Sequence, residues 1–309
     1  MTPYTGTLEH RRASLRAELV RLAARWLIKY RSRHATLEQV RKRMRALDAV
    51  TPAPRAGTRT ETIDAGAVKA HRISTPASRS GRHVLFLHGG GYATGSSAAY
   101  RHFTWRIASA ARAHVVAIDY RLAPEHPFPA ALDDAVSAYR WLLANHAQPS
   151  HLAVIGDSAG GGLAFALSLR AADEGLPAPA AIVALSPWTD LALTGRSLRR
   201  NVKADPLMNL GSVAMYARYY LAGTDPRTPY ASPLYGDLRK TPPTLIQVGS
   251  DEVLRDDAVR MADRLRALGR HVELEIWPRM PHVWHLFVPI LPEAHRAIAR
   301  IGAFLETRL

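Results

Sequence analysis

A short glycine-bounded turn carries the residue with the clearest chemical potential. The pentapeptide GDSAG, Gly156–Gly160, follows an apolar run typical of a buried strand and precedes a helical pattern at Leu163, Leu167 and Arg170. A serine hydroxyl becomes a nucleophile when a base takes its proton and little crowds it. This context predicts a G-x-S-x-G nucleophile elbow that presents Ser158. An anion-binding turn is the alternative, although the sequence lacks the Lys of a P-loop.

A second glycine-rich stretch, LFLHGGGYATG, could stabilise the negative charge that develops during acyl transfer. A tetrahedral intermediate needs preorganised hydrogen-bond donors around its oxygen. Three consecutive glycines at 89–91 allow bare backbone to approach a ligand closely. We expect the N–H groups of Gly90 and Gly91, with that of Ala159, to form an oxyanion hole. A flexible loop would explain the glycines alone, but it would not explain their pairing with the elbow.

In folds with a nucleophile elbow, the histidine base follows the last strand. The segment WPRMPHVWHLF contains both His282 and His285. His282 directly follows Pro281 in a loop context, whereas His285 lies within an apolar run and is expected to be a packed side chain. The pair could in principle bind a metal, but no H-E-x-x-H pattern surrounds it. We therefore predict His282 as the base and no metal site.

The carboxylate that would orient this histidine lies in the stretch VGSDEVLRDD. Asp256 and Asp257 are expected to begin the following helix, where acidic residues interact favourably with the helix dipole. Asp251 and Glu252 remain as alternatives. Either carboxylate could hold His282 and stabilise its charged form.

Alternating strands and helices are predicted to position these loops. A hairpin is expected around Ala65-Gly66, followed by apolar strand-like runs separated by helical stretches; the runs begin at His83, His114, His151, Ala180, Pro243 and His271. This order predicts an α/β fold with a mostly parallel, eight-stranded sheet flanked by helices. Two helices, at 8–30 and 36–48, and a proline-broken linker at 51–58 precede it.

The predicted domain organisation has one catalytic domain and two covering segments. We expect an α/β catalytic domain formed by residues 51–187 and 242–309. The interval 188–241 separates two strands by far more than the other intervals do, which indicates an insertion over the carboxyl edge of the sheet. Together with an N-terminal helical segment at 1–50, it would form a cap.

Charge is concentrated at the N-terminus. The chain has a formal net charge of +15, and residues 1–50 contribute 12 Lys and Arg against 4 Asp and Glu, or +8. A helical stripe in this region has arginines around it; the stripe consists of Leu15, Leu19, Leu22 and Trp26. We expect the stripe to pack on the body and the arginines to face solvent. The alternative is that this basic segment attaches the chain to a membrane or a nucleic acid.

Composition excludes several other classes. The 309 residues are 47% hydrophobic, which is ordinary for a globular protein, and they contain no Cys, so disulfides and thiolate catalysis are excluded. No zinc-finger or P-loop spacing occurs, and no nucleic-acid partner is expected. No run of 18 apolar residues and no secretory layout at Met1–His10 is found, so we expect a cytoplasmic protein without stable membrane insertion.

These motifs together resemble the bacterial hormone-sensitive-lipase-like carboxylesterases, or family IV esterases, of the α/β-hydrolase fold. The resemblance spans roughly residues 80 to 305, and besides the late histidine it rests on HGGGY at 88–92, DYRLAPEHPFPAALDDA at 119–135 and GDSAGG at 156–161. It implies ester hydrolysis through an acyl-enzyme, without a cofactor. By the same resemblance Ser158 is the nucleophile, His282 is the base and then the acid, and Gly90, Gly91 and Ala159 are the oxyanion donors. A homodimer is compatible with this family.

The family's acid motif, D-x-L-x-D, bears on the choice of carboxylate. EVLRD at 252–256 fits that frame without a gap, so the resemblance favours Glu252 over Asp251. A second departure is PHVWHLF in place of the usual His-Gly-Phe, where Val283 and Trp284 would narrow the site. The family's cap favours esters of short to medium acyl chains, with lactone or amide hydrolysis as the alternative. Several aromatic residues could line the pocket or form the cap core: Trp188, Tyr216, Tyr219, Tyr220 and Trp284.

Overall fold

Eight strands form one sheet in the computed structural model, which describes residues 13–30, 35–50, 53–145 and 147–309. Their order across the sheet is β1-β2-β4-β3-β5-β6-β7-β8. The strands are β1 (Arg59–Ala65), β2 (Val68–Ser74), β3 (His83–Leu87), β4 (His114–Ile118), β5 (Leu152–Asp157), β6 (Ala181–Leu185), β7 (Thr244–Gly249) and β8 (Val272–Trp277). β1 and β2 form the predicted hairpin, β2 pairs antiparallel with β4, and all other pairs are parallel. The predicted fold class is confirmed.

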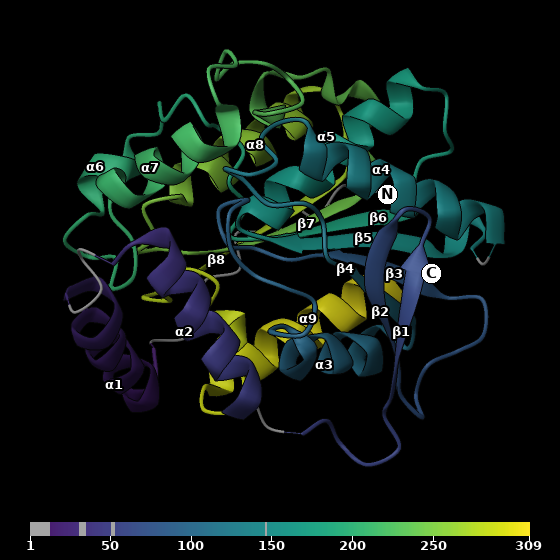
Figure 1. The fold of residues 1–309 in the computed structure, drawn as a ribbon, viewed down its shortest axis with the longest axis horizontal. Coiled ribbons are helices and arrows are strands. Elements are labelled where there is room, and N and C mark those ends of the chain that lie inside the picture. Colours follow the sequence, from purple (N-terminus) through teal and green to yellow (C-terminus); the bar gives the residue numbers. More distant parts are fainter. Residues whose placement is uncertain (1–12, 31–34, 51–52, 146) are drawn as a thin grey trace.

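Helices cover both faces of the sheet (Figure 1). One face carries α3 (Arg101–Ala111) and α9 (Pro292–Glu306), and the other carries α4 (Ala130–Asn145), α5 (Ala159–Asp173) and α8 (Arg255–Ala267). Every residue of β3, β5, β6 and β7 is buried. Strands covered on both faces are apolar on both, which is why these segments read as continuous apolar runs rather than as alternating ones.

The parallel register brings the chemically active loops to one edge of the sheet. Leu87 pairs with Gly156, so the ends of β3 and β5 lie side by side. Asp157 pairs with Leu185 at the end of β6, and Gly249 at the end of β7 pairs with Trp277 at the end of β8. The loops that follow these five strands therefore start from neighbouring points, and they contain the residues predicted to carry the chemistry.

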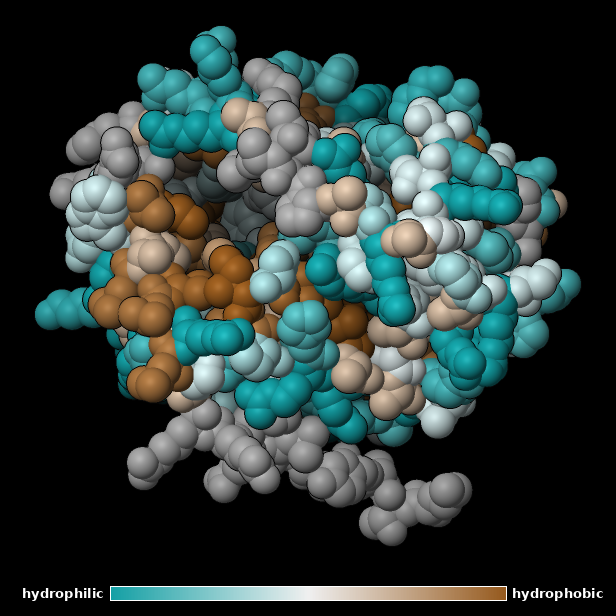
Figure 2. Space-filling view, turned by 90° about the horizontal axis from the view of Figure 1, so that it is seen from below, coloured by the Kyte–Doolittle hydropathy of each residue, from teal (hydrophilic) through white to brown (hydrophobic). Residues whose placement is uncertain are grey.

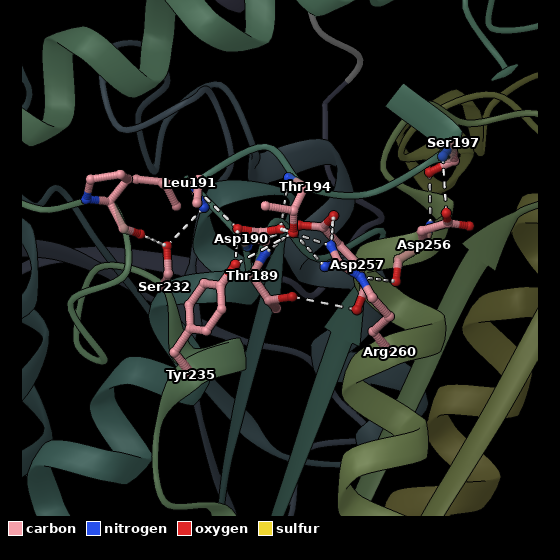
Figure 3. A network of polar contacts seen from close by, with 12 residues as sticks. Thr189, Asp190, Leu191, Thr194, Ser197, Ser232, Tyr235, Asp256, Asp257 and Arg260 are labelled. Atoms are coloured by element: carbon pink, nitrogen blue, oxygen red, sulfur yellow. Dashed lines mark hydrogen bonds and ion pairs between the residues drawn. The ribbon is translucent and has the colours of Figure 1, made fainter. Parts of the chain in front are cut away.

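The segment between β6 and β7 contains two α-helices, α6 (Ser197–Arg200) and α7 (Leu210–Leu221), and two short 3-10 helices, η3 (Pro233–Tyr235) and η4 (Leu238–Lys240). A polar network ties its first residues to α8 (Figure 3). The Oδ2 atom of Asp257 accepts hydrogen bonds from the backbone N–H groups of Thr189 and Asp190, both at 2.9 Å. Arg260 donates to the Asp190 carboxylate at 2.9 Å. These contacts fix the path of the chain where it leaves the sheet.

The N-terminal region forms α1 (Leu15–Ala24), the π-helical turn η1 (Arg25–Tyr30) and α2 (Leu37–Val50). Residues 8–12 of the first predicted helix lie outside the described residues. Ser14 caps α1 because its hydroxyl accepts a hydrogen bond from the backbone N–H of Ala17. These elements lie at the same end of the molecule as α6 and α7 (Figure 1). Within the described ranges, no helix has the length and apolar character needed to span a membrane.

The orientation of α1 and η1 contradicts, for Arg21 and Arg25, the expectation that the arginines around the stripe face solvent, whereas Arg16 is exposed as expected. Arg25 and Lys29 face the body, where Arg25 donates to the backbone oxygens of Lys203 and Ala204 at 2.8 and 3.1 Å. Lys29 donates to the backbone oxygen of Asp205 at 2.6 Å. The apolar stripe points outward instead, and its four residues are exposed: Leu15, Leu19, Leu22 and Trp26.

The reason for this inversion is the polar character of the surface on which α1 rests. Arg21 is buried, donates to the backbone oxygen of Arg279 at 2.7 Å and pairs with the Asp251 carboxylate. Arg279 in turn donates to Glu18 at 2.8 Å. Carbonyl oxygens and carboxylates need donors when they are covered, so the cationic face of the helix packs inward.

Candidate active site

Ser158 lies in a strained turn between β5 and α5. Its φ of 53° and ψ of −119° fall outside the usual regions for a residue with a side chain. A Cβ atom at Gly156 would lie 2.1 Å from the Gly160 oxygen, and one at Gly160 would lie 2.0 Å from the Leu87 oxygen. Only glycine fits at either position, because the turn brings helix and strand backbones into contact. The turn has the geometry expected of a nucleophile elbow.

His282 lies in the loop after β8 and reaches the serine. Its Nε2 atom is 2.9 Å from the Ser158 hydroxyl oxygen. The next residue, Val283, has a left-handed backbone conformation with a φ of 48°. This separation is within the hydrogen-bond range that a nucleophile and its base require.

Glu252, in the loop after β7, holds the other nitrogen of the same ring. Its Oε2 atom is 2.8 Å from His282 Nδ1. Its Oε1 atom accepts hydrogen bonds from the Ser186 hydroxyl at 2.7 Å and from the Gly249 N–H at 2.5 Å. Asp251, the alternative carboxylate, pairs with Arg21 of α1 instead. The structure thus brings Glu252, and not Asp251, into contact with His282.

The electrostatics of this pair favour a protonated imidazole more than bulk water does. Burial lowers the pKa of His282, but the hydrogen bond to Glu252 and its charge outweigh burial, so the pKa is raised above its ordinary value. Burial raises the pKa of Glu252, and the donors His282, Ser186 and Gly249 oppose that effect. A fully buried carboxylate with three hydrogen-bonding neighbours is well suited to orient an imidazole.

The two glycines predicted as oxyanion donors line the same cavity as Ser158. Gly90 has a φ of 115°, and a Cβ there would lie 2.2 Å from the Thr94 oxygen. Gly91 has a φ of 62°, and a Cβ there would lie 2.6 Å from the Tyr216 ring. Ala159 is the first residue of α5, where backbone N–H groups have no helical acceptor. Gly90 and Gly91 therefore line the cavity of Ser158, and Ala159 directly follows the serine at the start of the helix.

Asp157, which the sequence reasoning did not single out, links the elbow to the glycine loop. It accepts a hydrogen bond from the Gly89 N–H at 2.8 Å and another from the Tyr100 hydroxyl at 2.8 Å. Burial raises the pKa of Asp157 to about 7. This carboxylate fixes the start of the loop that carries Gly90 and Gly91 relative to Ser158.

Ser186 was also missed, and it sits between the histidine loop and the acid loop. It has a φ of 46°, donates to Glu252 and accepts a hydrogen bond from the Val283 N–H at 3.1 Å. Its only signal in the sequence is its position directly after the strand β6, next to the elbow strand. Because it contacts both loops, it holds Glu252 and the backbone beside His282 in fixed positions.

His285 is a packed side chain. It is fully buried, hydrogen-bonded to Gln247 at 2.8 Å, and its ring centre is 3.9 Å from that of Trp284. Burial lowers the pKa of His285 to about 3. Within the described residues, no group of three or more His, Asp or Glu side chains is arranged to hold a metal.

A cavity of about 1100 Å³ opens onto Ser158 and His282. Its walls come from the sheet edge, the β6–β7 insertion and the N-terminal helices, and include Leu27, Ile28, Val40, Trp188, Met208 and Tyr216. Of the aromatic and loop residues considered from the sequence, Trp188, Tyr216 and Val283 line this cavity. Tyr220 instead stacks on Tyr92 at a ring separation of 3.7 Å, and Trp284 is buried beside His285. The lining is mostly apolar, as expected of a small-molecule site.

Comparisons with known proteins show which families and structures this chain is similar to. A family model described as the alpha/beta hydrolase fold matches residues 84–286. An acetyl-hydrolase of Streptomyces hygroscopicus is 50% identical over 232 residues, which cover 75% of this chain and 78% of that protein. The putative acetyl-hydrolase LipR of Mycobacterium tuberculosis is 35% identical over 280 residues, covering 91% and 90%. A crystal structure of an esterase from the bacterial hormone-sensitive lipase family has a TM-score of 0.90 at 43% identity, covering 96% of this chain and 99% of that one.

Proposed function

Because this chain belongs to the α/β-hydrolase family, in its hormone-sensitive-lipase-like branch, and is a carboxylic ester hydrolase, we propose that Ser158, His282 and Glu252 are its catalytic triad. The observation that carries the proposal is the unbroken series of contacts from Ser158 Oγ to His282 Nε2, at 2.9 Å, and from His282 Nδ1 to Glu252, at 2.8 Å. Nucleophile, base and orienting acid are the three parts that acyl transfer needs.

In the first half of the reaction, the Ser158 oxygen attacks the carbonyl carbon of the ester and His282 Nε2 accepts its proton. The resulting oxyanion receives hydrogen bonds from the N–H groups of Gly90, Gly91 and Ala159. The bond to the alcohol oxygen then breaks, and His282 returns the proton to that oxygen. Glu252 keeps the Nδ1–H tautomer in place and stabilises the imidazolium.

In the second half, water replaces the alcohol. His282 takes a proton from the water as its oxygen attacks the acyl carbon bound to Ser158. A second tetrahedral intermediate forms in the same set of donors, and its collapse returns the proton to Ser158 and releases the carboxylic acid. All proton transfers use the one imidazole, so no cofactor enters the scheme.

The cavity walls suggest which esters fit. The N-terminal segment, 1–50, and the insertion, 188–241, act as a cap over the catalytic domain formed by 51–187 and 242–309. Apolar side chains from both cap segments line the cavity, among them Ile28 and Met208. Two similar proteins are named acetyl-hydrolases. We therefore assign short to medium acyl chains to this site.

A series of nitrophenyl esters with increasing acyl length tests this assignment, with Ser158→Ala as the control. We expect kcat/KM to be highest between the acetyl and medium-chain esters, to fall for long chains, and to be lost in Ser158→Ala. A preference for long acyl chains would contradict the assignment. Lactones and amides belong in the same screen, because turnover of either above that of the best ester would favour the alternative substrate class.

A further inference from the structure

Exposed apolar side chains of the described chain gather on the outward side of α1 and η1. Nine large hydrophobic residues are exposed in the described ranges; seven lie between positions 15 and 30, and the others are Leu268 and Ile290. We call the seven the apolar face: Leu15, Leu19, Leu22, Trp26, Leu27, Ile28 and Tyr30. Figure 2 shows hydrophobic side chains gathered on this side of the molecule, beside a hollow. A contiguous apolar patch of this kind marks an interaction site.

Polar anchors on its inner side hold α1 in this orientation. Leu15, Leu19 and Leu22 are 85%, 66% and 64% exposed. Rotating α1 about its axis to turn these leucines toward the body would break the contacts of Arg21 with Asp251 and of Arg25 with the backbone oxygens of 203–204. The outward leucines are therefore a consequence of how the helix is fastened.

Electrostatic complementarity identifies the occupant as an anionic surface. The chain has a net charge of +15, and +8 of it comes from residues 1–50. Three cations of this segment, Arg21, Arg25 and Lys29, bond to the body, so the charge available to a partner comes from the other basic residues of the chain. Arg16 lies exposed on α1, whereas Glu18, the acidic residue of that helix, is held by Arg279 at 2.8 Å. Basic groups near an anionic bilayer are attracted to its acidic headgroups. An apolar helix face within a cationic region is the pattern of helices that lie in the plane of a membrane surface.

Two other occupants fit the same observations less well. A second copy of the chain would cover the leucines, but it would bring a second charge of +15 against the first. A nucleic acid would neutralise the charge but would leave the leucines in water, since it presents phosphates outward. A lipid surface with acidic headgroups satisfies both the charge and the apolar area.

The apolar face is continuous with the catalytic cavity. Leu27 and Ile28 are 49% and 44% exposed, and both also line the cavity that contains Ser158. A surface that covers the leucines of α1 would therefore reach the cavity wall. We propose that the apolar face docks on an anionic lipid surface and turns the cavity entrance toward it. This proposal goes beyond the hydrolytic function and does not depend on it.

Vesicle flotation with the full chain tests the charge component. Phosphatidylcholine vesicles are compared with vesicles that also contain phosphatidylglycerol. We expect at least about tenfold stronger binding to the anionic vesicles, weakened when salt is raised. Absence of binding to anionic vesicles, or binding indifferent to both lipid charge and salt, would overturn the proposal.

A neutral triple variant, Leu15→Gln with Leu19→Gln and Leu22→Gln, tests the apolar component. We expect it to bind anionic vesicles at least about tenfold more weakly, because three side chains no longer enter the lipid. Leu268→Gln changes an exposed leucine outside the apolar face and should bind as the original chain does. Equal binding by the triple variant would contradict the proposal.

Further measurements separate docking from folding, self-association and catalysis. The leucines are exposed, so the triple variant should keep the original unfolding temperature and its turnover of a soluble acetate ester. The single change Leu19→Gln should give a smaller loss of binding in the same direction. Sedimentation equilibrium provides the test for self-association. A dimer of the unmodified chain that becomes a monomer in the triple variant would assign the apolar face to a second copy and overturn the proposal. Absence of ester turnover in the unmodified chain would refute the catalytic assignment and would not affect the interpretation of the vesicle binding.

Discussion

Glu252 Oε2 lies 2.8 Å from His282 Nδ1, while the neighbouring Asp251 pairs with Arg21 of the N-terminal helix. The two adjacent carboxylates therefore have different partners. Glu252 is fully buried and serves the imidazole, whereas Asp251 fastens α1 to the body.

Neutral replacements of these two acids should have very different consequences. We expect Glu252→Gln to lower kcat by a factor on the order of a thousand or more, because an amide does not stabilise the imidazolium and disturbs its tautomer. Asp251→Asn should keep kcat within about threefold, since Asp251 pairs with Arg21 and makes no contact with His282. Steady-state kinetics on one soluble ester measures both. Loss of turnover in Asp251→Asn alone would refute the assignment of Glu252.

The raised pKa of His282 predicts the position of the acid limb in the pH profile. Burial lowers this pKa, but Glu252 outweighs burial, so the net shift is upward. The base must be neutral to accept the serine proton, so kcat/KM should fall as pH drops through a value above the ordinary one of about 6.5. In Glu252→Gln the limb should move to lower pH, because the favourable charge is gone. A limb below that of free imidazole in the unmodified chain would contradict the contact.

Removing the Ser186 hydroxyl should weaken catalysis without weakening substrate binding. Ser186→Ala takes a donor from Glu252 and an acceptor from the Val283 N–H. A hydrogen bond to a charged group contributes roughly 1.5 kcal/mol, so we expect about a tenfold loss of kcat with KM little changed.

A matched control for Ser186→Ala is Ser232→Ala. The Ser232 hydroxyl accepts a hydrogen bond from the Leu191 N–H at 2.7 Å and donates one to the Pro226 oxygen at 2.6 Å, so it also has two partners. Its loss should lower the unfolding temperature and leave kcat unchanged. Equal kcat losses in both variants would mean that Ser186 acts through stability alone.

Asp157 should make the fold less stable as pH rises. Burial raises its pKa to about 7, well above the ordinary value of a carboxyl group, so the folded state retains a proton that the unfolded state has lost. The stability of the unmodified chain should decline relative to Asp157→Asn between roughly pH 4 and pH 7. Asparagine can still accept from Gly89 and contact Tyr100.

Unfolding temperatures of the two proteins across this range provide the measurement. Asp133→Asn, at an exposed position of α4, is the control and should run parallel to the unmodified chain. A constant difference between Asp157→Asn and the unmodified chain would show that Asp157 titrates alike in both states.

The sequence predicted the sheet and the main site residues because their signals are local. The elbow needs glycine at 156 and 160 on steric grounds alone, and the apolar runs reflect strands buried on both faces. The carboxylate required the resemblance, because composition and spacing left Asp251 and Glu252 equivalent. Coordinates distinguish them through Arg21, which lies far away in the chain.

Three features were missed or misjudged because they depend on long-range contacts. Asp157 and Ser186 carry no local signature, since their roles follow from which loops meet at the sheet edge. The orientation of α1 was predicted wrongly because a helical stripe shows which residues share a face. It does not show which polar groups on the body lie beneath the helix. The carbonyl oxygens of 203–205 and the Asp251 carboxylate attract its cations.

Covalent labelling tests the central claim, that one hydroxyl is activated by the His282–Glu252 pair. A fluorophosphonate is added to the full chain, and the modified residue is mapped by mass spectrometry. We expect a single label on Ser158, none in Ser158→Ala, and labelling in Glu252→Gln slowed by orders of magnitude. A label on another residue, or equally fast labelling in Glu252→Gln, would contradict the claim.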